Sequence, residues 1–185
     1  MPPPEPDTQP AGDWKTCFRE LAPRLVLYAR QFVDSVADAE DVVQMAFVRW
    51  WQRYPNGDRS QVPLLYAAVR SISLDMRRKD MRRILREAKS DVFVASENEP
   101  FFDASLEQRE SAQIVAGAMR GLPEEQREVV TLHLWGGLTF AQIAQTTGVS
   151  INTVAGRYRY ALAALQRKLE PRREDLDEAV AAPAT

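Results

Sequence analysis

Residues 138–162 constrain the fold most strongly, because they carry the start and stop signals of two short helices. Thr139, with Gln142 three positions later, forms a T-x-x-Q capping box that begins a helix. Gly148 is the residue type that ends a helix, and Ser150 can cap a second one directly after it. The turn between them has the length and glycine content of a helix-turn-helix.

The second of these helices has two faces of different character. At about 100° per residue, an apolar stripe forms that we expect to pack on the first helix. It consists of Val154, Tyr158, Ala161 and Leu165, with Leu162 beside it. The opposite face carries Asn152, Gly156, Arg159, Tyr160 and Ala163, with Thr153 and Arg157 at its flanks. Asn pairs with adenine and Arg with guanine in the major groove, so this face predicts DNA binding. The alternative is a solvated polar face on an ordinary helix.

Length and composition narrow the class of protein. The 185 residues suit one domain or two small ones, and 45% hydrophobic residues are enough for a folded core. Cys17 is the only cysteine and His133 the only histidine, so we expect no disulfide framework and no metal site. No G-x-x-x-x-G-K-[ST] loop occurs, and no cofactor is expected. Because no apolar run of membrane-spanning length and no signal peptide are present, we expect a cytoplasmic protein without membrane insertion.

The net charge of −2 hides a segregation of charge along the chain. Eight basic residues lie between positions 70 and 89, namely Arg70, Arg77, Arg78, Lys79, Arg82, Arg83, Arg86 and Lys89. The following stretch, 90–110, is mostly acidic. The basic stretch can hold a phosphate backbone, which the acidic connector cannot. The alternative is that the basic stretch is only a solvated helix face.

Apolar residues recur at helical spacing on both sides of the acidic connector. Trp14, Phe18, Leu21, Leu25, Tyr28 and Phe32 predict a first helix. Further helices are expected over 38–54, with Ser35 or Asp38 as cap, from 62 into the basic stretch, and over 106–122 and 123–135. No alternating apolar–polar stretch is long enough for a sheet. The predicted fold is therefore all-α, with two small helical domains joined by a flexible acidic linker, the second containing the helix-turn-helix.

Three stretches carry a resemblance to a known family. They are DAEDVVQMAFVRWW at 38–51, YAAVRSISLDMRRKDMRR at 66–83, and LPEEQREVVTLHLWGGLTFAQIAQTTGVSINTVAGRYRYALAALQRKL at 122–169. In this order and spacing they resemble the extracytoplasmic-function (ECF) sigma factors of bacterial RNA polymerase. The resemblance covers roughly Trp14 to Leu169, and D-A-E-D-x-V-Q is a far more specific motif than the helix-turn-helix.

The resemblance implies a division of the chain by function. The expected parts are a disordered tail at 1–12, a domain for polymerase binding and minus-ten recognition and melting at 13–89, a linker at 90–106, a minus-thirty-five domain at 107–170, and a tail at 171–185. In such sigma factors the D-A-E-D helix docks on a coiled coil of the polymerase clamp. The residues placed at that interface are Asp38, Glu40, Asp41, Gln44 and Phe47. The alternatives are dipole capping for the acids and core packing for Phe47.

Minus-ten recognition is implied for the loop 54–64 and the helix after it. Asn56, Asp58 and Arg59 could bond a base that leaves the stack, while Arg70, Arg77 and Arg78 would follow the strand. The family often has Trp, Arg and Asn where this chain has Leu64, Ala67 and Ser71, which leaves less for stacking and backbone contact.

Minus-thirty-five recognition is implied for the second helix of the pair. Its expected DNA contacts are Asn152, Thr153, Gly156, Arg157, Arg159 and Tyr160. Relatives commonly have TVKSR or TVRSR where this chain has TVAGR, so a basic residue and a serine are replaced by Ala155 and Gly156. Gly in a helix costs about 0.5–1 kcal/mol relative to Ala, and a close approach of the backbone to DNA is one hypothesis for its presence.

The predicted function follows from these assignments. The chain is expected to be a non-enzymatic sigma factor whose partners are core RNA polymerase, promoter DNA and an anti-sigma factor, and which is not an obligate homo-oligomer. The main alternative is a dimeric helix-turn-helix repressor with a helical sensor domain, which would bind duplex DNA unaided. A recombinase would need a mixed α/β catalytic domain. A purely protein-binding adaptor would leave the capped helix pair unexplained.

Overall fold

The computed structural model describes residues 14–55, 57–87 and 106–172, with only the backbone for 106–111. These residues form helices and the turns between them, and no strand occurs among them. This confirms the predicted all-α class. The tails expected at 1–12 and 171–185 and the linker expected at 90–106 lie outside the described residues, apart from Leu106 and 171–172, which are helical.

The N-terminal unit is built from three α-helices and one short 3-10 helix. They are α1 (Trp14–Ala29), α2 (Val36–Arg53), η1 (Arg59–Gln61) and α3 (Val62–Glu87). Of the two caps considered for α2, Ser35 is the one used, because its hydroxyl accepts a hydrogen bond from the Asp38 backbone N–H at 3.0 Å. α3 continues through the basic residues from Arg70 to Arg86, as predicted, and Lys89 lies outside the described residues.

Aromatic side chains hold the three helices of this unit together. The Phe47 ring of α2 lies edge to face with the Phe18 ring of α1, with 4.9 Å between centroids. Tyr28 of α1 and Tyr66 of α3 meet in the same way at 5.4 Å, and both are fully buried. Such pairs add about 0.5–1.5 kcal/mol each beyond the burial of their surface. Trp14, by contrast, is 52% exposed at the start of α1 and lies outside this core.

The C-terminal unit contains the remaining helices. They are α4 (Leu106–Arg120), α5 (Glu124–Leu134), α6 (Phe140–Thr147), α7 (Ile151–Leu169) and the 3-10 helix η2 (Glu170–Arg172). A small apolar cluster of Met119, Leu122, Val130 and Ala161 ties α4, α5 and α7 together. Leu162, expected beside this packing side of α7, is 40% exposed.

The helix-turn-helix forms at the residues that predicted it. The Thr139 N–H donates to Gln142 Oε1 at 2.9 Å, and the Gln142 N–H donates to Thr139 Oγ1 at 3.3 Å, which completes the capping box of α6. Gly148 ends α6 with φ at +75°, a left-handed conformation that favours glycine. Ser150 then caps α7 by accepting from the Thr153 N–H at 3.1 Å. Local chemistry therefore fixes both ends of the turn.

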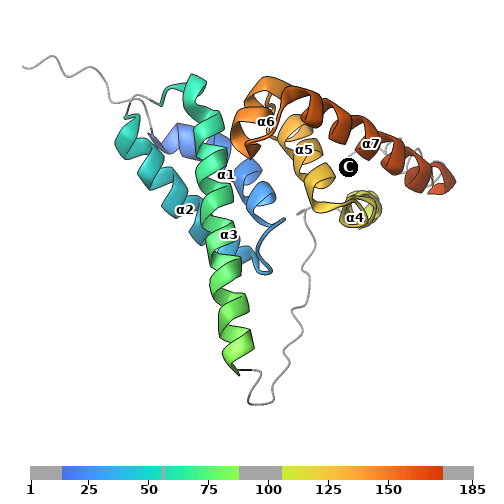
Figure 1. Ribbon diagram of the computed structural model, residues 1–185, viewed down its shortest axis with the longest axis horizontal. Helices are drawn as coiled ribbons and strands as arrows, with labels where there is room; N and C mark the ends of the chain where they lie inside the picture. Colours follow the sequence, from blue (N-terminus) through green and yellow to red (C-terminus); the bar gives the residue numbers. More distant parts are fainter. Residues whose placement is uncertain (1–13, 56, 88–105, 173–185) are drawn as a thin grey trace, which may run out of the picture.

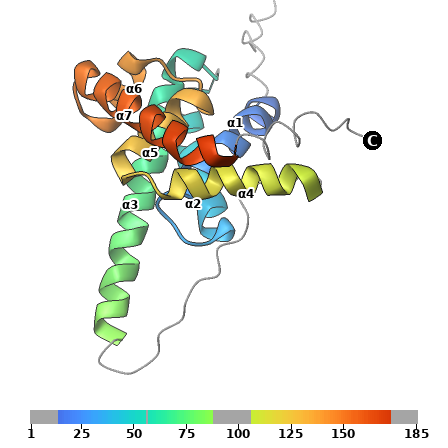
Figure 2. The same cartoon turned by 90° about the vertical axis from the view of Figure 1, so that its right-hand side faces the viewer.

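The two units pack against each other. Buried residues of both form one continuous apolar cluster, from Leu25 and Val69 in the N-terminal unit to Val129 and Ile143 in the C-terminal unit. α3 packs against α6, and α1 contacts α5. Figure 1 and Figure 2 show the first part of α3 beside the C-terminal unit, while the end of α3 projects away from the other helices.

Candidate polymerase and nucleic-acid interfaces

An exposed face of α2 carries three of the residues predicted to bind core polymerase. Glu40, Asp41 and Gln44 are all exposed. Counting from Asp41, the positions i+3, i+4 and i+7 are Gln44, Met45 and Val48, which share one side of the helix. Met45 is 39% and Val48 55% exposed. These two apolar residues were not among those predicted for the interface, because apolar residues at this spacing could equally have belonged to the core.

The other two residues predicted for this interface have partners inside the chain. Asp38 is half-buried in the first turn of α2, and its carboxylate accepts a hydrogen bond from the Ser35 hydroxyl at 2.6 Å. This is the capping alternative, favoured by the positive end of the helix dipole. Phe47 is only 4% exposed, between the rings of Phe18 and Trp51. The burial of Phe47 against α1 agrees with the core-packing alternative for this residue.

The loop before α3 is organised by Asp58. Its carboxylate accepts hydrogen bonds from the Ser60 hydroxyl at 2.8 Å and from the Ser60 N–H at 2.9 Å, and these bonds lower the pKa of Asp58. Asp58 thereby caps η1. Arg59 is exposed and forms an ion pair with Glu20 of α1. Asn56, the third residue predicted to bond a flipped base, lies outside the described residues.

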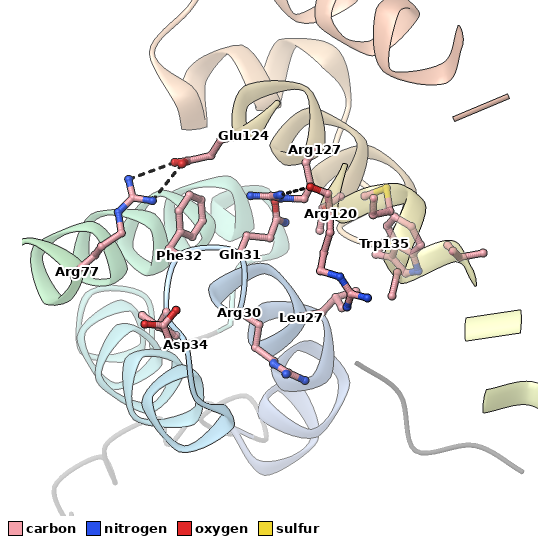
Figure 3. A pocket seen from close by; sticks show the side chains of 15 residues that line it. Leu27, Arg30, Gln31, Phe32, Asp34, Arg77, Arg120, Glu124, Arg127 and Trp135 are labelled. Carbon is pink, nitrogen blue, oxygen red and sulfur yellow. Dashed lines mark hydrogen bonds and ion pairs between the residues drawn. The ribbon is translucent and has the colours of Figure 1, made fainter. Parts of the chain in front are cut away.

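Two of the arginines predicted to follow the minus-ten strand have exposed acidic partners. Arg78 pairs with Asp75 one turn earlier on α3, with Nη1 and Oδ1 2.9 Å apart. Arg77 reaches to Glu124 of α5, with its two Nη atoms 3.1 and 3.3 Å from the two carboxylate oxygens (Figure 3). Two parallel N–H···O bonds of this kind give a guanidinium–carboxylate pair both strength and a defined orientation.

The third arginine, Arg70, belongs to a buried network between the units. Its Nε donates to Glu128 Oε1 at 2.7 Å, and the Tyr28 hydroxyl donates to the same oxygen at 2.7 Å. Glu128 is only 2% exposed. Burial raises the pKa of Tyr28 well above its usual range, and the Glu128 carboxylate raises it further, so Tyr28 stays a hydrogen-bond donor. Burial is the largest single influence on Arg70 and lowers its pKa, but the hydrogen bond and charge of Glu128, with the nearby Tyr28 and Glu124, together outweigh burial and raise the pKa of Arg70.

α7 presents most of the predicted minus-thirty-five residues to solvent. Val154 and Ala161 are fully buried, which confirms the predicted packing side. On the other side Asn152, Thr153, Arg159 and Tyr160 are exposed, while Gly156 and Arg157 are half-buried. The Arg159 guanidinium lies 5.3 Å from the centroid of the Tyr160 ring, a cation–π contact that orients both side chains.

Gly156 lies in an open part of this face. A Cβ added there would meet no atom of the described residues within 4 Å, apart from its own helix and chain neighbours. Packing within the chain therefore does not require glycine at this position. The open space agrees with the hypothesis that another molecule approaches the backbone here.

The only histidine supports the helix-turn-helix from behind. His133 of α5 lies with its ring 5.0 Å from that of Phe140 and 4.9 Å from that of Tyr158. Its Nδ1 is 2.9 Å from the Leu138 carbonyl oxygen, within hydrogen-bonding distance. The ring thus ties α5 to both helices of the pair. Among the described residues, no three His, Cys, Asp or Glu side chains gather as metal ligands would.

A cavity of about 290 Å³ separates part of the two units (Figure 3). Four arginines line it, from the turn after α1 and from α3, α4 and α5, namely Arg30, Arg77, Arg120 and Arg127. Apolar side chains include Leu27, Phe32, Met119 and Trp135. No helix in the described ranges is long and apolar enough to cross a membrane.

Comparisons with known proteins agree with the order of these sites along the chain. Residues 17–83 match the family Sigma-70 region 2, and residues 112–165 match the family Sigma-70, region 4. The chain is 30% identical over 161 residues to the ECF RNA polymerase sigma factor SigL of Mycobacterium tuberculosis, covering 84% of this chain and 88% of SigL. It is also 30% identical over 155 residues to the RNA polymerase sigma-E factor of Streptomyces avermitilis, covering 83% and 82%.

The fold is also that of a solved sigma factor. The sigma factor RpoE of Bartonella quintana, determined in complex with the anti-sigma factor NepR, superposes with a TM-score of 0.65 over 85% of this chain and 97% of RpoE, at 24% identity. The chain belongs to the ECF sigma factors of the sigma-70 family. It is accordingly a factor that directs RNA polymerase to promoters, and the comparisons give no support to the dimeric repressor.

Proposed function

We propose that this sigma factor binds core polymerase with the exposed face of α2 and reads promoter DNA with η1, α3 and α7. The observation that carries this proposal is that α7, the second helix of a capped helix-turn-helix, turns Asn152, Arg159 and Tyr160 to solvent in a chain of the sigma factor family.

The α2 face is suited to a protein partner with basic groups. Glu40 and Asp41 supply negative charge that sets register, and Gln44 adds hydrogen bonding. Met45 and Val48 supply the apolar surface that a docking helix buries. Asp38 contributes through the cap of α2, and its carboxylate is partly available beside this face.

The minus-ten strand is proposed to contact the loop and helix that follow α2. Asn56, Asp58 and Arg59 would bond an unstacked base, and Arg70, Arg77 and Arg78 would hold the backbone. In the minus-thirty-five element, Asn152, Arg159 and Tyr160 would contact base edges, and Thr153 and Arg157 would contact phosphates. The DNA would pass close to the backbone at Gly156. With one DNA-binding region in each half, the chain would divide into a domain at 13–89, a linker at 90–106 and a second domain at 107–170.

The remaining expectations belong to the same proposal. The chain would act in the cytoplasm beside RNA polymerase, without catalysis of its own, without membrane insertion and not as an obligate homo-oligomer. An anti-sigma factor is proposed as a further partner, since the solved relative from Bartonella quintana is bound to one.

Run-off transcription with core polymerase on a pool of genomic promoters tests the proposal. We expect a small set of discrete start sites that appears only when the chain and the core are both present. Start sites that are the same with and without the chain would contradict it. A variant with Asp41→Arg on the α2 face should lose these start sites, whereas Glu125→Arg, on an exposed position of α5, should keep them.

A further inference from the structure

The C-terminal unit lies on the face of α3 that carries two of the proposed minus-ten contacts. Three positions of α3 spaced by seven residues, Pro63, Arg70 and Arg77, each bond to the C-terminal unit. Seven residues are close to two turns, so these positions lie on one side of the helix. That side is therefore occupied along most of its length when the two units are packed together.

The bonds to the two arginines imitate those of a nucleic-acid backbone. Glu124 offers both carboxylate oxygens to the two Nη atoms of Arg77, and Glu128 offers one oxygen to Nε of Arg70. Carboxylates and phosphates both present oxygen pairs that a guanidinium binds in the same plane. Glu128 of the C-terminal unit is buried, and one of its oxygens accepts from two donors of the N-terminal unit, Arg70 and the Tyr28 hydroxyl.

We propose that the packed arrangement is an autoinhibited state, in which Glu124 and Glu128 of α5 occupy Arg77 and Arg70 in place of the single-stranded promoter backbone. This inference rests on the proposed role of these arginines in minus-ten binding. Tyr28 strengthens the state by donating to Glu128, and Thr146 adds a further bond by donating to the Pro63 carbonyl oxygen at 3.2 Å. The strand and α5 compete for the same guanidinium groups.

The same interface also contains features that make it reversible. The cavity of about 290 Å³ leaves part of it unpacked. The side-chain amide of Gln31 and Nε of Arg127 are buried with no hydrogen-bond partner among the described residues, and both residues line this cavity (Figure 3). Burying an ion pair such as Arg70–Glu128 costs desolvation, which offsets part of the attraction between the two charges. A partner that binds the separated units better can therefore open them.

Two measurements on the full-length chain without polymerase test this state. The first is energy transfer between dyes on Gln52→Cys of α2 and Gln166→Cys of α7, both exposed, in a Cys17→Ser background. The second is the affinity for a fluorescent single-stranded oligonucleotide of the non-template minus-ten region, taken from a promoter found by run-off transcription. The apparent affinity for the oligonucleotide depends on the fraction of molecules whose two units are separated. Energy transfer and affinity should therefore change together.

Tyr28→Phe and Glu128→Gln weaken the contact between the two units, and neither substitution changes a residue that is proposed to bind DNA. Tyr28→Phe also leaves the net charge of the chain unchanged. Each should lower energy transfer and raise oligonucleotide affinity about tenfold, since a bond to a buried charge is lost or weakened. Glu124→Gln, on a half-exposed position that the fold tolerates, should act in the same direction. Glu125→Gln removes one charge from the neighbouring exposed position and should change neither measurement.

The outcomes separate the two ideas. If energy transfer is unchanged in all three variants, the proposed autoinhibited state is wrong, whatever their affinity for the oligonucleotide. Lower energy transfer without a rise in affinity would mean that the units open but that Arg70 and Arg77 do not bind the strand. That result would overturn both the competition and the proposed minus-ten role of these arginines.

Discussion

Arg157 and Arg159 lie two positions apart on α7 but in different surroundings, since Arg157 is half-buried and Arg159 is exposed beside Tyr160. We predict that Arg159→Ala relaxes sequence preference at one or two minus-thirty-five positions, with a loss of about 1–3 kcal/mol at the base concerned. Arg157→Ala should weaken all sequences about equally and reduce the salt dependence, because it removes a phosphate contact.

Transcription across a promoter library randomised in the minus-thirty-five element measures both effects. Full sequence preference in Arg159→Ala, together with altered preference in Arg157→Ala, would mean that the DNA-facing side of α7 is assigned wrongly.

Gly156 separates stability from DNA binding. Because a Cβ there meets no described atom outside its own helix and chain neighbours within 4 Å, Gly156→Ala should raise the free energy of unfolding by about 0.5–1 kcal/mol. Gly156→Gln should keep much of that gain but impair promoter binding if the backbone lies close to DNA. Denaturant unfolding and promoter binding by the polymerase complex measure the two effects. A Gln variant with normal promoter binding would remove the close-approach hypothesis.

Asp41 tests the polymerase interface. Charge reversal by Asp41→Arg should weaken the complex with core polymerase while the isolated chain stays folded, because this side chain is exposed. Pull-down with core polymerase and circular dichroism measure the two properties. The matched variant Glu125→Arg should leave the pull-down unchanged. If core polymerase retains the Asp41→Arg variant as well as the original chain, this face of α2 is not the polymerase-binding surface.

Individual residues show where sequence reasoning was sufficient. Ser35, Thr139 and Ser150 were readable because a cap acts on a backbone N–H two or three positions away. The burial of Phe47 was not readable from the motif, because it depends on Phe18, which lies on another helix. An aromatic residue within a motif does not by itself reveal which neighbour it packs against.

At the scale of elements, the N-cap of α7 links stability to recognition. Ser150→Ala removes the acceptor for the Thr153 N–H and should lower the free energy of unfolding by about 1 kcal/mol. The first turn of α7 carries Asn152 and Thr153, so fraying there should also weaken minus-thirty-five binding. Thermal unfolding and promoter binding measure these effects. Ser150→Asp, which keeps a capping oxygen, is the control, and an equal loss in both variants would show that capping is not the cause.

The helices themselves followed from local signals. Thr139 and Ser150 begin α6 and α7 and Gly148 ends α6, as predicted. For α2 the sequence left two caps open, Ser35 and Asp38, and Ser35 is the one used. The protein interface on α2 was only partly predictable, since Met45 and Val48 are apolar residues that could equally have been core. Their exposure depends on which side of α2 the other helices cover.

At the scale of the whole molecule, the packing of the two units was not predictable from the sequence. Glu128 and Tyr28 are 100 residues apart, and Glu128 and Arg70 are 58 apart. Capping motifs and periodicity are local signals and do not predict contacts over such separations. The segregated charges indicated only that the basic stretch needs anionic partners. The sequence therefore predicted the two helical units and their order, while their contact came from the structure.

The central claim is that polymerase is required before this chain reads a promoter. Footprinting of a duplex promoter, with the chain alone and with the chain on core polymerase, tests it most directly. We predict weak protection by the chain alone, and strong protection of the minus-ten and minus-thirty-five elements once core polymerase is added. Tight, sequence-specific protection by a homodimer of the chain without polymerase would contradict the account and favour a repressor.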